Sequence, residues 1–175
     1  MPAAFKKYFP RTWSIIDCSE FFIQRPRKVT QQYKTYSSYK SHNTFKALLS
    51  INPYGAFNFV SDLWSGNTSD IFITKHCGFL DNIKPGMDVM ADRGFDIMDV
   101  LLKRNATLSC PAFTRKCGYG KGKRLNVSEI LRTRQIARFR IHVERAIQRL
   151  KCYRMASNTM PLSYKPIASQ IIKVA

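Results

Sequence analysis

The stretch WSIIDCSEFFI, residues 13–23, decides the fold of this chain. It is rich in β-branched and aromatic side chains, and the basic segment RPRK at 25–28 follows it, which is typical of a β-strand that runs into a loop. Asp17 lies in the middle of the expected strand. A carboxylate in such an apolar setting is unfavourable unless its charge is compensated, so Asp17 is a candidate metal ligand. The alternative is an acid that is hydrogen-bonded at a sheet edge.

Two further apolar runs follow this strand, FKALLSI at 45–51 and AFNFVSDLW at 56–64. The four residues between them, NPYG at 52–55, place Pro second and Gly fourth in a turn, which predicts an antiparallel hairpin. The polar segment before the hairpin, residues 30–42, is rich in Tyr and Ser and is expected to be a loop.

Helical and strand patterns alternate after the hairpin. The expected elements are, in order, a helix over 71–77, a strand over 87–91, a helix over 96–104 and a strand over 106–110. Asp92 stands where the 87–91 strand leaves the sheet, which makes it a candidate ligand; the alternative is that it only caps the helix that follows. Asp70 is a rival carboxylate, but capping explains its place at a helix start.

A long helix is expected over 128–154, because its apolar residues recur at steps of three or four. Between residues 130 and 154 the sequence holds eight basic residues and a single carboxylate, Glu144. On a helical wheel Glu144 flanks the apolar stripe and lies about 40° from Arg140. This isolation favours a ligand role for Glu144; the alternative is a simple ion pair with Arg140, one turn earlier.

The order of these elements predicts an α/β fold, a mixed central sheet flanked by helices, of the kind found in RNase H-like nucleases and integrases. In such a fold Asp17, Asp92 and Glu144 can converge at one edge of the sheet. Cleavage of a phosphodiester requires a nucleophile to be activated and a leaving oxygen to be stabilised, and two divalent ions about 3.5–4 Å apart can do both. Carboxylate oxygens are the ligands that Mg²⁺ prefers.

The charge of the chain indicates a polyanionic partner. Its 29 Lys and Arg residues against 11 Asp and Glu give a net charge of +18, which points to nucleic acid. No apolar run approaches the roughly 20 residues needed to span a bilayer, and the first residues lack the apolar stretch of a secretory signal, so no membrane association is expected. The five cysteines include no CxxC pair and are expected to be reduced, as in a cytosolic or nuclear protein.

Candidate DNA-binding cations fall in three places: the segment after the first strand, the basic Gly-rich segment 115–124, and the long helix. They are Arg25, Arg27, Lys28, Lys121, Lys123, Arg124, Arg140 and Arg145. The 115–124 segment is expected to be a flexible loop that follows a phosphate backbone. It could equally act as a nuclear import signal or be merely solvated.

Five stretches together resemble the DDE endonuclease domain of PIF/Harbinger-type transposases. They are FPRTWSIIDC (9–18), YKSHNT (39–44), FVSDLWSGNTSD (59–70), MADRGF (90–95) and RIHVERAIQRLK (140–151). The resemblance implies an RNase H-like fold, a catalytic and metal-binding triad matched here by Asp17, Asp92 and Glu144, and DNA strand cleavage and transfer with Mg²⁺, for which Mn²⁺ can substitute. It also implies action in the nucleus, and it is compatible with a separate DNA-binding partner protein and with a homo-oligomer.

The resemblance divides the chain into three parts. Residues 1–12 are expected to be an N-terminal remnant, 13–155 the RNase H-like DDE endonuclease domain, and 156–175 a C-terminal extension. Relatives carry DNA-binding segments upstream of the first catalytic strand, so we expect the chain to be a fragment or a degraded copy. Two rival hypotheses therefore stand beside the nuclease: a domesticated or decayed DNA-binding module without catalysis, and a basic scaffold protein.

Overall fold

The computed structural model describes residues 1–112, 115–117 and 121–175, with side chains described outside 113–124. Its centre is a mixed sheet in the order β2-β3-β1-β6-β7, with β4 and β5 also paired to β3. The strands are β1 (Thr12–Phe22), β2 (Tyr36–Ser37), β3 (His42–Ile51), β4 (Phe57–Val60), β5 (Trp64–Ser65), β6 (Asp88–Met90) and β7 (Thr107–Ser109). The predicted mixed sheet is therefore confirmed.

β1 is the central strand, as its apolar sequence predicts. It pairs antiparallel with β3 along most of its length, with Asp17 opposite Leu49. On its other side it pairs parallel with β6, but only from Thr12 to Ile15. The rest of this edge of β1, which begins next to Asp17, is therefore not covered by β6.

The predicted hairpin is confirmed, but its second arm is interrupted. Gly55 closes the turn with φ +88° and donates its backbone N–H to Asn52 O at 2.9 Å. The arm expected over 56–64 is divided into β4 and β5. At the division the Ser61 hydroxyl accepts the backbone N–H of Leu48 at 2.9 Å, so β3 donates here to a side-chain oxygen of the second arm instead of to a backbone carbonyl.

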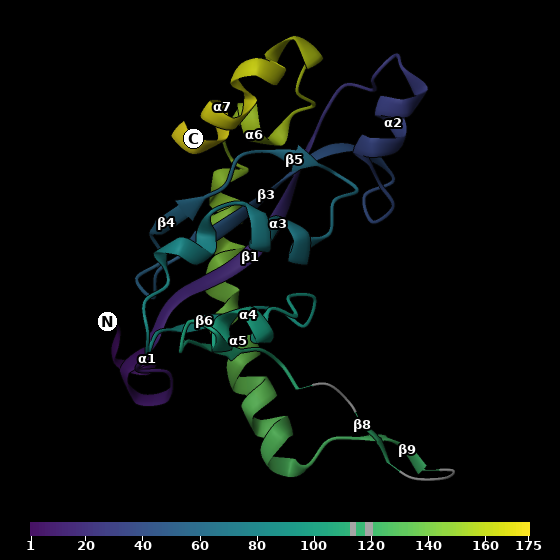
Figure 1. Ribbon diagram of the computed structural model, residues 1–175. Coiled ribbons are helices and arrows are strands. Elements are labelled where there is room, and N and C mark those ends of the chain that lie inside the picture. Colours follow the sequence, from purple (N-terminus) through teal and green to yellow (C-terminus); the bar gives the residue numbers. More distant parts are fainter. Residues whose placement is uncertain (113–114, 118–120) are drawn as a thin grey trace.

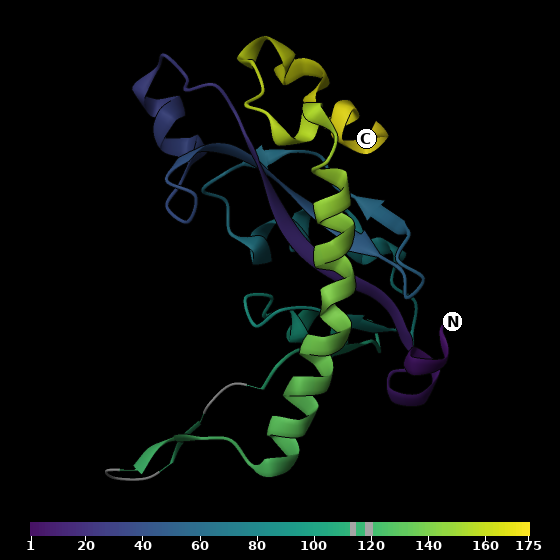
Figure 2. The same ribbon diagram turned by 180° about the vertical axis from the view of Figure 1, so that it is seen from behind.

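Helices cover both faces of the sheet (Figures 1 and 2). They are α1 (Ala3–Tyr8), α2 (Val29–Thr35), α3 (Asp70–His76), the 3₁₀ helix η1 (Phe79–Asn82), α4 (Met98–Leu102), α5 (Val127–Leu150), α6 (Arg154–Ser157), the 3₁₀ helix η2 (Leu162–Ile167) and α7 (Ala168–Val174). α3, η1 and α4 pack on one face around Phe79, while α5 crosses the other. The expected helices over 71–77, 96–104 and 128–154 are all present, the last two shorter than predicted.

The face under α5 holds a core that both ends of the chain complete. Phe139 of α5 packs edge-on against Phe5 of α1, with ring centroids 4.6 Å apart. Met160 and Ile172, from the C-terminal segment, belong to the same buried cluster. Residues that precede the sheet strands in the sequence and residues that follow them therefore pack into one core.

Two segments differ from their predicted loops. Residues 30–42 include most of α2 and all of β2. The Asn43 side-chain amide donates to Gln32 O and to Thr35 Oγ1, both at 2.9 Å, and so ties α2 to β3. The basic segment 115–124 contains an antiparallel pair, β8 (Arg115–Cys117) with β9 (Lys121–Arg124). Residues 118–120 of this segment lie outside the described residues.

None of the helices described has the length and apolar character that crossing a membrane requires.

Candidate active site

A cavity of about 530 Å³ lies along the edge of β1 that β6 does not cover. Asp17 from β1, Asp92 from the loop after β6, and Glu144 from α5 all line it. The structure therefore brings the three acids predicted from sequence to one cavity. Arg140, which the helical wheel places near Glu144, lines it as well.

The carboxyl of Asp17 has a raised pKa. Partial burial raises the pKa of its carboxyl from 3.8 to about 6, an effect that the nearby Arg140 charge opposes and the Asp70 and Asp92 charges increase. The backbone N–H of Cys18 donates to Asp17 Oδ1 at 2.9 Å. Asp17 is therefore a carboxylate whose negative charge the protein compensates incompletely, as expected of a cation ligand.

Arg140 links the other two acids. Its Nη1 lies 3.2 Å from Asp92 Oδ1, and its Nη2 lies 3.8 Å from Glu144 Oε1. The side chain of Arg140 is only 11% exposed, and its Nε is buried with no hydrogen-bond partner among the residues that the structure describes. Asp92 does not cap α4, because the residue before α4 is Ile97 and that helix start has no side-chain cap.

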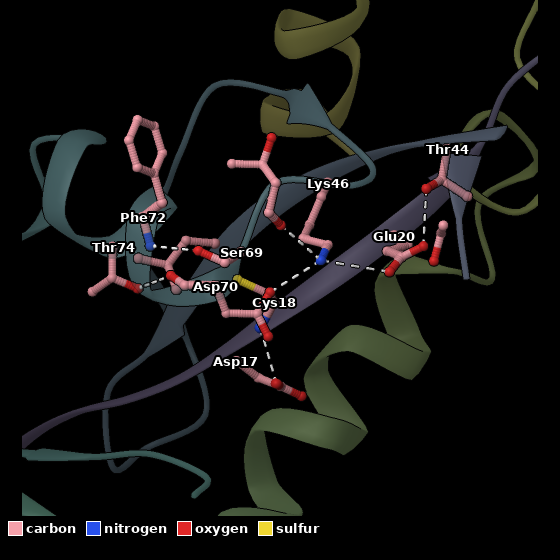
Figure 3. A network of polar contacts seen from close by, with 12 residues as sticks. Asp17, Cys18, Glu20, Thr44, Lys46, Ser69, Asp70, Phe72 and Thr74 are labelled. Atoms are coloured by element: carbon pink, nitrogen blue, oxygen red, sulfur yellow. Dashed lines mark hydrogen bonds and ion pairs between the residues drawn. The ribbon is translucent and has the colours of Figure 1, made fainter. Parts of the chain in front are cut away.

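A second polar network lies on the opposite face of β1 from Asp17 (Figure 3). Lys46 Nζ contacts Asp70 Oδ1 at 3.1 Å and Glu20 Oε1 at 3.7 Å, and Thr44 donates its hydroxyl to Glu20 Oε2 at 2.9 Å. Figure 3 shows Asp17 directed toward α5 and away from this network. All three charged residues of the network also line the cavity.

Sequence reasoning missed Lys46 and Glu20, and it explained Asp70 by capping. The cap of α3 is instead Ser69, whose hydroxyl accepts the Phe72 N–H at 3.2 Å, while Asp70 pairs with Lys46. The signal for the Lys46–Glu20 pair is the strand register, which sets these two residues opposite each other on β3 and β1. That register is not visible in the sequence.

The predicted DNA-binding cations occupy different settings. Arg140 lies among the carboxylates, Arg27, Lys28 and Arg145 are exposed, and Arg25 donates to the Gln32 side-chain oxygen at 2.9 Å. The side chains of Lys121, Lys123 and Arg124 lie outside the described residues.

The donor set of the cavity suits a hard divalent cation, because its acids present carboxylate oxygens. Within the part of the chain that the structure describes, however, no three Asp, Glu, His or Cys side chains are grouped as ligands of one ion. The Arg140 guanidinium supplies positive charge to Asp92 and Glu144 instead. The carboxylates of the cavity therefore suit a divalent metal by their chemistry. In the structure, Arg140 balances part of their negative charge.

Fold and site together define a mixed α/β protein with a cavity, lined by five acids and four cations, at the open edge of its central strand. A family model described as DDE superfamily endonuclease matches residues 16–175, so the chain belongs to this family. The family implies a transposase-like nuclease, DNA as the substrate and, in general, divalent metals as cofactors. A search of curated proteins and a search of solved structures each found no match.

Proposed function

We propose that the chain is the metal-dependent DNA endonuclease and strand-transferase domain of a PIF/Harbinger-type transposase, with an RNase H-like fold, and that it acts in the nucleus. The observation that carries the proposal is the convergence of Asp17, Asp92 and Glu144, from three separate elements, on one cavity. The sheet supports the fold assignment, since β3 runs antiparallel to β1 while β6 and β7 run parallel to it.

Asp17, Asp92 and Glu144 would hold two divalent ions, Mg²⁺ or Mn²⁺ in its place. Metal held by these residues would supply the positive charge that stabilises the attacking and leaving oxygens of the phosphodiester. Because the pKa of Asp17 is about 6, its carboxyl is mostly ionised above pH 7 and is then available as a ligand. Arg140 holds Asp92 and Glu144 toward the cavity through its two terminal nitrogens.

DNA would be bound mainly through its phosphates. The net charge of +18 supports this, since phosphate contacts supply most of the sequence-independent affinity. The proposed contacts are Arg25, Arg27, Lys28, Lys121, Lys123, Arg124, Arg140 and Arg145. A separate DNA-binding partner protein, or a homo-oligomer, would supply sequence selection in this scheme.

Nicking of supercoiled plasmid in Mg²⁺ tests the proposal. Asp92→Asn keeps the shape of the side chain but loses the charge that holds a cation, so nicking should disappear while DNA binding in EDTA is unchanged or slightly tighter. Asp81→Asn is the matched control, because Asp81 lies in η1, outside the cavity, and forms an exposed pair with Arg104 at 3.3 Å. Equal nicking by the parent and Asp92→Asn would overturn the assignment.

A second candidate is a DNA-binding module without catalysis. The observation in its favour is that Arg140 already pairs with Asp92 and Glu144. A parent protein that binds DNA tightly but does not nick it in Mg²⁺ or Mn²⁺ would support this candidate over the nuclease.

A further inference from the structure

The connection between β1 and β3, residues 24–42, differs in composition from the other segments that line the carboxylate cavity. It carries five Lys and Arg residues, three tyrosines and no acidic residue. The tyrosines recur at every third position and are unusually exposed, with Tyr33 79%, Tyr36 46% and Tyr39 84% exposed. In Figure 1 this connection includes α2 and stands out from the sheet.

These tyrosines join the carboxylate cavity to two further cavities. Tyr39 lines the carboxylate cavity and also a neighbouring cavity of about 410 Å³. Tyr36 lines that neighbour and also a third cavity of about 670 Å³, to which Tyr33 contributes. Because they share lining residues, the three cavities form one path that begins at Asp17 and ends beside α2.

The wall that residues 24–42 give to this path combines aromatic rings with positive charge, while Glu20 and Asp70, which both pair with Lys46, line the wall across from it in two of the cavities. Lys40 Nζ lies 4.5 Å from the centre of the Tyr39 ring, and Arg25 and Tyr33 line the third cavity together. Its walls there also include the apolar Ile23 and the exposed Val29. Exposed aromatic and apolar surface beside cations suits a ligand with flat apolar faces and a charged backbone.

Unpaired DNA is the ligand with this chemistry. Proteins that bind single strands combine a positive groove for the backbone with aromatic side chains on which successive bases stack. Bases inside a duplex already stack on one another, so exposed tyrosines discriminate in favour of unpaired nucleotides. The absence of acids from residues 24–42 complements the phosphates.

We propose that Tyr39, Tyr36 and Tyr33 form a stacking track for unpaired nucleotides of the DNA strand that leaves the carboxylate cavity. The proposal rests on the proposed function, because DNA is taken to be the substrate. It adds that the site accepts a frayed or single-stranded end rather than an intact duplex alone.

Binding measured by fluorescence anisotropy in EDTA tests the track without any need for catalysis. The probes are a blunt duplex and the same duplex with a short unpaired tail that carries 2-aminopurine. The parent should bind the tailed probe more tightly and quench the 2-aminopurine fluorescence. Tyr33→Ala and Tyr39→Ala should each lose about tenfold in affinity for the tailed probe and little for the blunt one.

Matched variants separate stacking from other effects. Tyr33→Phe and Tyr39→Phe keep the ring and should retain the preference for the tail. Tyr54→Ala removes a tyrosine of similar exposure, 71%, from the distant β3–β4 turn and should behave like the parent. Because all these side chains are exposed, the variants should unfold at the parent's temperature.

The outcomes distinguish the track from the proposed function. Salt-sensitive binding of both probes with equal affinity, or a tail preference that survives both Tyr→Ala changes, would overturn the track and leave the nuclease standing. Failure of the parent to bind either probe would overturn DNA as the substrate and the track with it. Tyr→Ala changes that alter only the oligomeric state would show that a second copy of the chain covers this surface, and would also overturn the track.

Discussion

At the scale of single residues, the site combines groups that oppose the stability of the folded chain. Asp17 is partly buried with its charge incompletely compensated, and the buried Nε of Arg140 has no partner within the described part of the chain. Groups of this kind are retained where they serve binding or chemistry. The cost of keeping Asp17 can therefore be measured.

Asp17→Asn should stabilise the metal-free protein at neutral pH. The pKa of Asp17 is about 6 in the folded protein and 3.8 in the unfolded chain, so the folded state binds the proton more strongly. The free energy of unfolding therefore falls as the pH rises from about 3.8 to about 6. Removing the charge should raise the free energy of unfolding by about 2 kcal/mol at pH 7.5 and by little near pH 3.5. Urea denaturation in EDTA measures both.

The control for this change is Asp81→Asn, an exposed acid outside the cavity. It should alter stability little at either pH. If Asp17→Asn instead lowers the free energy of unfolding by the same amount at both pH values, Asp17 contributes to the stability of the fold and is not kept as a metal ligand.

Arg140→Gln should raise the pKa of Asp17 further, because the Arg140 charge lowers it. An NMR titration of the Asp17 side-chain carboxyl carbon measures the shift. Arg138→Gln is the matched control, since Arg138 lies on the same helix with an exposed side chain. An Asp17 titration that moved equally in both variants would reflect net charge rather than the contact with Arg140.

At the scale of elements, the parts set by local sequence were predictable. The apolar run of β1, the Pro–Gly turn before β4 and the helical spacing of α5 all appear at or near their expected residues. The elements that were missed depend on distant contacts: α2 on the Asn43 amide, and the break between β4 and β5 on Ser61 bonding to β3. Glu20 and Lys46 were missed for the same reason, because strand register pairs them.

α5 depends on its packing against the N-terminal helix. Phe139 lies with its ring centroid 4.6 Å from that of Phe5 and 5.1 Å from that of Phe9. Phe139→Ala should lower the free energy of unfolding by about 3–4 kcal/mol, whereas Arg138→Ala, one residue earlier and exposed, should change it little. Urea denaturation is the measurement, and equal effects of the two changes would contradict this packing.

At the scale of the whole molecule, the net charge of +18 dominates. Repulsion among 29 cations opposes the compact state, and a polyanion relieves it. The carboxylate cavity differs from the rest of this basic molecule, because five acids line it beside four Lys and Arg residues. We interpret the basic surface as the means of holding DNA and the cavity as the place where a cation joins it.

Affinity for duplex DNA should fall steeply as salt rises and should vary little with sequence, because each phosphate neutralised releases counterions. Titrations of two unrelated duplexes across a range of salt concentrations measure the slope. A shallow slope, or a strong preference for one duplex, would mean that base contacts rather than phosphate contacts dominate.

Mn²⁺ binding followed by electron paramagnetic resonance shows whether Asp17, Asp92 and Glu144 hold a divalent cation. The parent and Asp81→Asn should remove free Mn²⁺ from solution equally. Asp17→Asn, Asp92→Asn and Glu144→Gln should each weaken binding by about tenfold or more, since each loses a charged oxygen ligand. Mn²⁺ binding that is unchanged in these three variants, or absent from the parent, would contradict the assignment of these acids as cation ligands.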